Sequence, residues 1–294
     1  MAGRLANLFS PGTVTTGLPY FDYQRAVARE AVLPWLRPRV RLERAAVADF
    51  GAHQGGLLDE VRASTGAASG LGIELNEAVV ASSPFVADER FRLEVGDLTA
   101  LDPEAGPFDL IFLHDVLEHV VDVERVLAAA AARLTPEGRL FVAFPPYRGP
   151  FGGHQHLASG WARAAPYLHY LPGRAFFRLA RPGANEYMSS ADSLSDLVSV
   201  RRTRLTLGRA ERAFGAAGLR VVARRLFLVR PEHTLRYGVP TVGAGPVGAL
   251  PVLRELAVSG AYYLLARQPQ PLGLRVDVTD MAEAIELLDA PAAR

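Results

Sequence analysis

Short apolar runs alternate with stretches of helical periodicity through the first half of the chain. The runs are rich in Val, Leu, Ile and Phe, which is typical of buried strands, and lie at 46–50, 70–75, 91–95, 108–113 and 139–144. The stretches between them repeat apolar residues every three to four positions, most clearly at 55–64 and 121–134. This alternation predicts a parallel, doubly wound α/β sheet with right-handed crossovers.

Further elements are predicted on either side of this region. Residues 20–35 should form a helix that breaks near Pro34 and Pro38, and Asn76 should cap a helix that runs to about residue 86. Later in the chain the pattern predicts a helix at 207–217, a strong strand at 219–229 and a last strand at 261–266.

Two segments interrupt the alternation. Residues 145–206 are rich in Gly, Pro, Arg and aromatic residues, and an insertion of this length at a sheet edge is expected to form a substrate cap or lid. Residues 230–258 read as a second irregular insertion, with glycines and prolines concentrated at 243–251. The sequence therefore predicts one domain over 1–294 that carries two insertions.

The segment after the first strand has the composition of a ligand-binding turn. Asp49 precedes Gly51, and Gly55 and Gly56 close the turn before a helix. Glycine allows a left-handed backbone and close approach of a ligand. Dinucleotide enzymes use G-x-G-x-x-G, but here His53 occupies the middle position, where an imidazole would crowd a pyrophosphate. A ligand without phosphates, such as S-adenosyl-L-methionine (SAM), fits this turn better.

Composition removes several classes of function. The net charge of +1 gives no electrostatic case for nucleic acid, and the absence of cysteine removes disulfides and thiolate chemistry. All 32 basic residues are arginine, which excludes Schiff-base chemistry and a P-loop lysine. The first residues do not resemble a secretory signal, and no apolar stretch reaches about 18 residues. A cytoplasmic protein without a transmembrane segment is expected, and the oligomeric state stays unknown.

With these elements in place, the chain resembles the class I SAM-dependent methyltransferases, and specifically the small-molecule enzymes akin to the ubiquinone and menaquinone methyltransferases. The resemblance is strong over about 40–144 and extends to 207–267 by the order of elements. His53 departs from the family pattern, in which glycine or cysteine is usual. The motifs that carry the resemblance are ADFGAHQGG (48–56), GIELN (72–76), VGD (95–97), FDLIFLHDVLEHV (108–120) and LTPEGRLFVAFPP (134–146).

The resemblance implies a Rossmann-like sheet of seven strands with an antiparallel last strand, and SAM as cofactor. Glu74 would accept hydrogen bonds from both ribose hydroxyls and Asp97 from the adenine amino group, their alternatives being a solvated helix-start charge and a plain turn residue. His114 would lie near the transferred methyl. The implied cofactor-binding residues are Asp49, Gly51, Ala52, His53, Gly55, Glu74, Leu75, Asp97, Leu98, His114 and Tyr23.

Candidate catalytic residues follow the fifth strand. His154 and His156 lie in the glycine-rich segment FGGHQH, where substrate should enter, and a histidine suits proton abstraction at neutral pH. A metal site that adds Asp115 or His114 to these histidines was the weaker interpretation, because the loop lacks a matched carboxylate motif. No metal is therefore expected. Glu118 and His119 should shape the turn and cap the next helix.

Methyl transfer is an in-line displacement in which positioning dominates. The expected acceptor is a small or medium apolar metabolite methylated on oxygen, with carbon and nitrogen left open. The aromatic run 161–177 could wall an apolar pocket or touch a membrane surface. Two rivals are a non-catalytic SAM-fold binding module and an NAD-dependent oxidoreductase, the latter disfavoured by His53.

Overall fold

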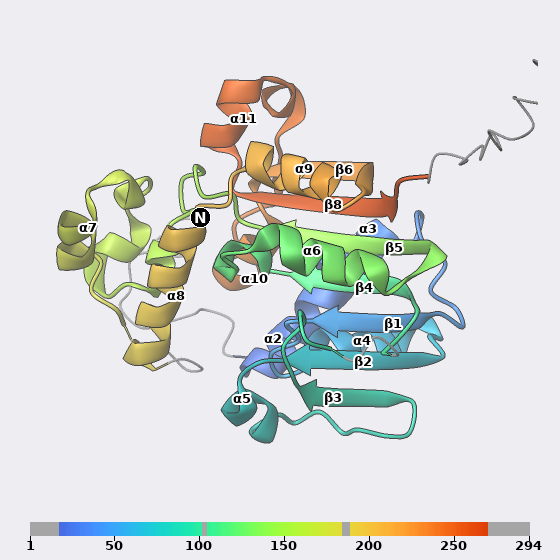
Figure 1. Ribbon diagram of the computed structural model, residues 1–294. Helices are drawn as coiled ribbons and strands as arrows, with labels where there is room; N and C mark the ends of the chain where they lie inside the picture. The colour runs from blue at the N-terminus through green and yellow to red at the C-terminus, as the bar shows by residue number, and fades with distance from the viewer. Residues whose placement is uncertain (1–17, 102–104, 184–188, 270–294) are drawn as a thin grey trace, which may run out of the picture.

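The computed structural model describes residues 18–101, 105–183 and 189–269. Its centre is a twisted sheet with the strand order β3-β2-β1-β4-β5-β8-β6-β7 (Figure 1). Strands β1 to β5 pair in parallel, whereas β8 runs antiparallel to both β5 and β6. The predicted Rossmann-like sheet with an antiparallel last strand is confirmed.

The strands follow the predicted apolar runs closely. Their bounds are β1 Ala46–Phe50, β2 Ser69–Glu74, β3 Phe91–Val95, β4 Phe108–His114, β5 Leu134–Phe144, β6 Leu219–Val229, β7 Val242–Gly243 and β8 Gly260–Arg267. The described part of the sheet thus has eight strands where seven were expected. The additional strand, β7, comprises two exposed residues at the edge of β6, which is too short to leave a hydrophobic pattern.

The helices of the α/β body agree with the sequence except at two boundaries. Their bounds are α2 Tyr20–Val27, η1 Ala28–Val32, α3 Leu33–Leu36, α4 Gly56–Thr65, α5 Glu77–Ala81, α6 Val123–Ala132 and α9 Leu207–Ala216. Pro34 does not break the first helix, because it lies at the start of α3 directly after a π-helical turn. Asn76 caps α5 as predicted, but α5 ends at Ala81 rather than near residue 86.

Each face of the sheet packs against its own set of helices. Along β4, Leu110 and Phe112 pack with α2, α3 and α4, whereas Ile111 and Leu113 pack with α6 and α9. This alternation follows from the two-residue period of a strand. Because both faces are covered, the strands read as almost uninterrupted apolar runs in the sequence.

Residues 145–183 and 189–206 follow the carboxyl end of β5 and form a lobe beside that edge of the sheet (Figure 1). The lobe, called the cap below, contains η3 Gln155–Leu157, η4 Gly160–Ala164, η5 Leu168–Tyr170, α7 Gly173–Leu179 and α8 Ser190–Thr203. It has a small core of its own that includes Leu168, Phe176 and Leu197. The cap therefore lies at the edge where ligands bind in open α/β sheets.

The segment 230–258 was predicted to be irregular and is instead mostly helical. It contains α10 Pro231–Tyr237, β7, η6 Gly245–Ala249 and α11 Pro251–Ala257. The prolines at 243–251 that suggested a loop stand at helix starts, Pro246 in η6 and Pro251 in α11, where a missing N–H costs nothing. Among the described residues no helix combines the length and apolarity needed to cross a bilayer.

Candidate active site

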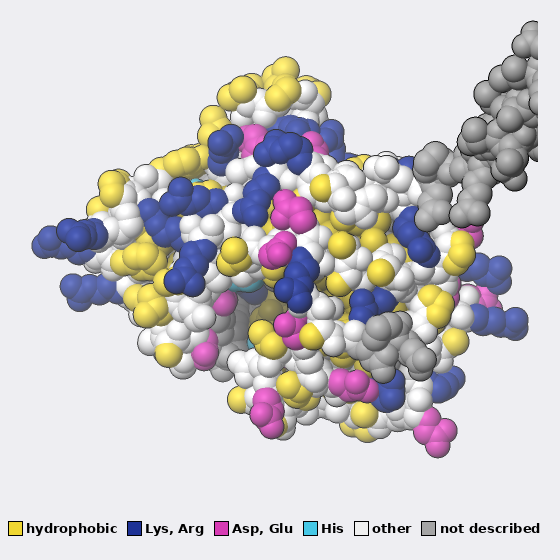
Figure 2. Space-filling model, viewed as in Figure 1, with side chains coloured by type: hydrophobic (Ala, Val, Ile, Leu, Met, Phe, Trp, Pro, Cys, Tyr) yellow, Lys and Arg dark blue, Asp and Glu magenta, His cyan; other side chains and the backbone are white. Residues whose placement is uncertain are grey.

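One cavity of about 740 Å³ lies between the carboxyl edge of the sheet and the cap. In Figure 2 the surface is hollowed between these two parts, and histidine is visible in the hollow. Most of the predicted site residues line this cavity, although they come from segments far apart in the sequence. They are Tyr23, Asp49, Gly51, His53, Glu74, Leu75, Asp97, Leu98, His114, His154 and His156.

Glu74 holds the glycine turn in place. Its Oε2 accepts a hydrogen bond from the backbone N–H of His53 at 2.9 Å, and its Oε1 accepts one from Asn76 at 2.9 Å. His53 has a left-handed backbone, with φ of 50°, and its ring lies 4.3 Å from that of Tyr20. The imidazole therefore packs on helix α2, which leaves Glu74 at the wall of the cavity.

Helix α2 closes the turn from the other side. Gln24 donates from Nε2 to the carbonyl of Ala52 at 3.0 Å and accepts from Gly56 N–H at 3.3 Å. Gly56 fits beneath α2 only because it lacks a side chain, since an added Cβ would lie 2.3 Å from the carbonyl oxygen of Phe21. Gln24 was not identified from the sequence, because a lone glutamine on a helix carries no motif.

Two predicted cofactor residues lie behind the cavity wall instead of on it. Ala52 is fully buried, and Gly55 begins α4 with φ of 79° and faces Phe85. Asp97 does line the cavity, and it also makes the turn contact that was its alternative role. Its Oδ1 accepts from the backbone N–H and the hydroxyl of Thr99, and these bonds lower the pKa of Asp97.

Asp49 is a buried carboxyl group in the cavity wall. Its side chain is 2% exposed, and burial raises its pKa from 3.8 to about 7, opposed by the nearby His114 and assisted by Glu74. A carboxyl group in this state gains most from a cationic ligand group, because the cation replaces the lost solvation of the carboxylate. The methionine ammonium of SAM is such a group.

A buried polar network fixes the side chain of His114. Glu232 accepts from His114 Nε2 at 3.0 Å and from the Tyr262 hydroxyl at 2.8 Å, and Arg230 pairs with Glu232 at 2.7 Å. Arg230 also forms two bonds to Asp115, at 2.7 and 2.9 Å. Burial works to lower the pKa of His114, but Asp115 and Glu232 outweigh it and the pKa rises.

The same network holds the pKa of Glu232 well below its usual range. Burial alone would raise that pKa, but the charge and hydrogen bond of Arg230 and the hydrogen bond from His114 prevail. Arg230 and Glu232 were not singled out from the sequence. Their signal was the charged string Arg230-Pro231-Glu232-His233 directly after a strong strand, and His233 lines the cavity as well.

The two candidate bases approach from the cap. His154 is 7% exposed, and its ring lies 5.2 Å from that of His156. Burial depresses the pKa of both well below the usual value, and unfavourable interactions of the charged form with neighbouring groups add to this effect, chiefly with His119 for His154 and with Arg236 for His156. Both imidazoles are therefore neutral at pH 7 and carry a lone pair.

Glu118 does not act as predicted. It was expected to shape the turn and cap the next helix together with His119, but the N-cap of α6 is Asp122, which accepts from the backbone N–H of Arg125. Glu118 instead lies buried in η2 Leu117–His119, close to His154. The sequence could not show this contact, because it forms only when the cap packs against the turn after β4.

Residues 48–140 match the profile of a protein family described as a methyltransferase domain. They run from β1 into β5 and include the glycine turn, Glu74, Asp97 and His114. By sequence and by fold, this part of the chain resembles the SAM-dependent methyltransferases. The cap and the strands β6 to β8 lie outside the matched part.

Curated relatives resemble a part of the chain of similar length. The ubiquinone biosynthesis O-methyltransferase of Coxiella burnetii (strain RSA 493 / Nine Mile phase I) is 30% identical over 112 residues, which are 37% of this chain and 47% of the relative. That of Xylella fastidiosa (strain 9a5c) is 38% identical over 117 residues, or 38% and 46%. The chain spans about half the length of the curated relatives it matches.

Solved structures share the fold of the methyltransferase domain. A SAM-dependent methyltransferase from Mesorhizobium loti aligns with a TM-score of 0.50 and 19% identity, covering 82% of this chain and all of that one. The [4+2]-cyclase SpnF aligns with a TM-score of 0.50 and 13% identity, covering 84% and 82%. At such identities the likeness concerns the fold, and the cyclase shows that this fold does not by itself define the reaction.

Proposed function

We propose that this protein transfers the methyl group of SAM to an oxygen atom of a small or medium, largely apolar metabolite. The observation that carries the proposal is a cavity lined both by Glu74 and Asp97, from the sheet edge, and by His154 and His156, from the cap. The volume of about 740 Å³ lies within the usual range of roughly 300–1,000 Å³ for ligand pockets.

The sheet edge would hold the cofactor. Glu74, at the end of β2, would accept the ribose hydroxyls, and Asp97, after β3, the adenine amino group. Asp49 would face the methionine ammonium. This order follows the edge of the parallel strands, so that the sulfonium would lie over the turn after β1, close to His114.

The cap would hold the acceptor. Its contribution to the wall combines the apolar side chains of Phe151 and Leu157 with polar and charged groups, among them His156, Arg163 and Asp196. The positive groups Arg236, Arg230 and Arg163 that lower the pKa of His156 would equally stabilise an oxygen anion beside it. An acceptor with an ionisable hydroxyl, such as a phenol, suits this environment best.

The reaction then needs one proton acceptor. His156 takes the hydroxyl proton, the acceptor oxygen forms a bond to the methyl carbon, and the carbon–sulfur bond breaks with its electron pair going to sulfur. The products are the methyl ether and S-adenosylhomocysteine. Preorganised geometry supplies most of the acceleration, and a general base contributes typically about 10²–10⁴-fold.

The curated relatives support oxygen as the acceptor atom, since both are named as O-methyltransferases. They also support a methyltransferase over an NAD-dependent oxidoreductase. A non-catalytic SAM-binding module is the remaining rival, because Glu74 and Asp97 support cofactor binding without requiring turnover.

Production of S-adenosylhomocysteine from SAM, measured against a panel of phenols, catechols, alcohols and amines, tests the proposal. A phenolic or catecholic acceptor should give turnover, and His156→Gln should lower kcat by about 10²–10⁴-fold with the SAM dissociation constant unchanged. His169→Gln, a change at a buried cap histidine outside the cavity, is the matched control. SAM binding with no turnover on any acceptor would favour the binding module, and no SAM binding would refute the proposal.

A further inference from the structure

Glu118 is a buried carboxyl group without a hydrogen-bonded partner. It lies in η2, directly after β4, and is 1% exposed. Neither of its carboxylate oxygens has a hydrogen-bond partner among the described residues. An ionised carboxylate in such a place is costly, so that the group must either hold a proton or face a cation.

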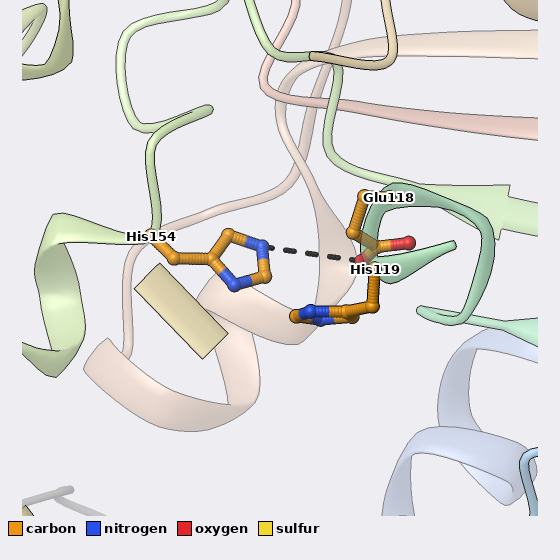
Figure 3. A group of neighbouring side chains, drawn as sticks. All are labelled: Glu118, His119 and His154. Carbon is orange, nitrogen blue, oxygen red and sulfur yellow. Dashed lines mark ion pairs between the residues drawn. The ribbon is translucent and has the colours of Figure 1, made fainter. Parts of the chain in front are cut away.

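Two histidines flank this carboxyl group. Nε2 of His154 lies 3.9 Å from Oε1 of Glu118, and the rings of His154 and His119 are 5.0 Å apart. Figure 3 shows the three side chains converging, with His154 coming from the cap and the other two from the turn after β4. Each offers a donor atom within 4.8 Å of the others.

The protonation of His119 is set by its neighbours. The Ser199 hydroxyl lies 2.9 Å from the carbonyl oxygen of Asp196 and 2.8 Å from Nδ1 of His119, and the Asp196 carboxylate, 3.9 Å from the same nitrogen, favours a proton there. Nδ1 therefore carries the proton and Nε2 the free lone pair. Metal-binding histidines are commonly oriented in this way, through an outer hydrogen bond from the second ring nitrogen.

The described residues contain a second group of potential metal ligands, His114, Asp115 and Glu232, but the carboxylates of this group already have partners. Its carboxylates are already paired with Arg230, and Glu232 also accepts from His114 and Tyr262. A cation there would compete with a guanidinium that is already in place. Glu118 has no such partner among the described residues.

We propose that Glu118, His119 and His154 bind a divalent transition-metal ion, with Zn²⁺ as the best match. Two imidazoles and one carboxylate form a familiar zinc ligand set that leaves a coordination position open. With metal–ligand bonds of about 2.0–2.1 Å, tetrahedral donors lie roughly 3.4 Å apart. The separations of 3.9 to 4.8 Å therefore require the cap and the turn to close by about 1 Å.

The site lies at the wall of the cavity, because His119 and His154 both line it. An ion there would bind an oxygen of the acceptor and leave His156 as the proton acceptor. This role rests on the proposed methyl transfer, whereas the binding of the ion does not. No metal was expected because the loop that carries His154 and His156 has no matched carboxylate. In the folded protein Glu118, from the turn after β4, supplies this carboxylate.

The test uses the full-length protein after dialysis against a chelator and then against metal-free buffer. Zn²⁺ binding is measured by equilibrium dialysis with elemental analysis, and Co²⁺ binding by the visible absorption of four-coordinate cobalt. One equivalent of either ion per chain is expected, with the cobalt spectrum of a tetrahedral nitrogen–oxygen site. SAM binding and thermal unfolding of every variant are followed in parallel as checks on folding.

Glu118→Gln and His154→Gln should each weaken binding of Zn²⁺ at least tenfold and abolish the cobalt spectrum. Glu118→Gln is decisive because it mimics a protonated carboxyl group: if Glu118 merely held a proton, this variant would not alter the binding of either ion. His169→Gln, at a second buried cap histidine, should bind metal as the parent does. Asp196→Asn, which neutralises the carboxylate 3.9 Å from Nδ1 of His119, should weaken binding less than the ligand changes.

Two results would overturn the proposal. One is a parent protein that takes up neither Zn²⁺ nor Co²⁺ stoichiometrically at micromolar concentrations. The other is stoichiometric uptake that Glu118→Gln and His154→Gln leave unchanged. Neither result would bear on methyl transfer, because SAM binding and S-adenosylhomocysteine production are measured separately.

Discussion

The backbone N–H of His53 donates a hydrogen bond of 2.9 Å to Oε2 of Glu74 and so joins the glycine turn after β1 to the end of β2. Glu74 thereby shapes the turn and also presents a carboxylate to the cavity. The imidazole that replaces a glycine in this turn is held against Tyr20. The glycine turn is therefore held to the end of β2 in spite of the bulky residue at position 53.

Replacing Glu74 should weaken SAM binding in two steps. Glu74→Gln keeps one acceptor oxygen, whereas Glu74→Ala removes both and releases the N–H groups of His53 and Asn76. A hydrogen bond to a charged group contributes about 1.5–3 kcal/mol, so that Glu74→Ala should raise the dissociation constant by more than about tenfold and Glu74→Gln by less. Calorimetric titration measures both. The exposed Glu77→Ala should bind SAM normally, and equal affinity of Glu74→Ala and parent would contradict the assigned role.

Asp49 should make the protein less stable as pH rises. Its folded pKa of about 7 lies above the ordinary 3.8, so that the folded state favours the neutral carboxyl and the unfolded chain favours ionisation between these values. The free-energy cost of ionising Asp49 in the folded protein grows from pH 4 to pH 7 and is complete above pH 7. At about 1.36 kcal/mol per pKa unit, this cost is on the order of 4 kcal/mol.

Asp49→Asn removes this cost, so that the variant should have a higher unfolding free energy than the parent at pH 8. The difference between variant and parent should be smaller at pH 4.5. Urea unfolding at the two pH values gives the comparison. Asp22→Asn, at an exposed position, should change stability by less than about 0.5 kcal/mol at either pH. A difference between Asp49→Asn and parent that is the same at both pH values would argue against the buried, neutral state of Asp49.

Arg230 and Glu232 should be strongly coupled in stability. Both are buried, and breaking a buried pair by removing one partner costs about 3–5 kcal/mol because the other charge is left uncompensated. Arg230→Met and Glu232→Gln should each destabilise the protein in urea unfolding. The double variant should lose less than the sum of the two, by about 0.5–3 kcal/mol. Additive losses would mean that the two residues act independently.

Gly56 and Gly215 offer a comparison of two helical glycines. A Cβ at Gly56 would meet the carbonyl oxygen of Phe21 at 2.3 Å, whereas a Cβ at Gly215 would meet nothing within 4 Å. Gly215→Ala should raise the melting temperature, because alanine favours a helix by up to about 1 kcal/mol. Gly56→Ala should lower it and weaken SAM binding, since α2 must move away from α4. A neutral Gly56→Ala would show that α2 is not tightly seated.

Local patterns were sufficient to predict the α/β body. Strands β1, β2 and β4 are buried on both faces, so that they appear as apolar runs, whereas the edge strand β3 is largely exposed. Asn76 caps α5 through contacts within its own turn. The shared edge of Asp49, Glu74 and Asp97 follows from the parallel order of β1, β2 and β3. The helix break predicted at Pro34 was wrong. A π-helical turn before this proline allows the helix to continue, although a proline normally ends one.

The sequence by itself determined the strands, the glycine turn and the acidic residues at the strand ends, because those depend on neighbours a few positions away. Only the tertiary structure decided that Arg230 pairs with Asp115 and that His154 from the cap meets Glu118. Such contacts depend on how loops and the cap return to the sheet edge, and side-chain burial there sets the charge of each group. The hydrophobic pattern of the sequence does not indicate which of these distant residues will meet.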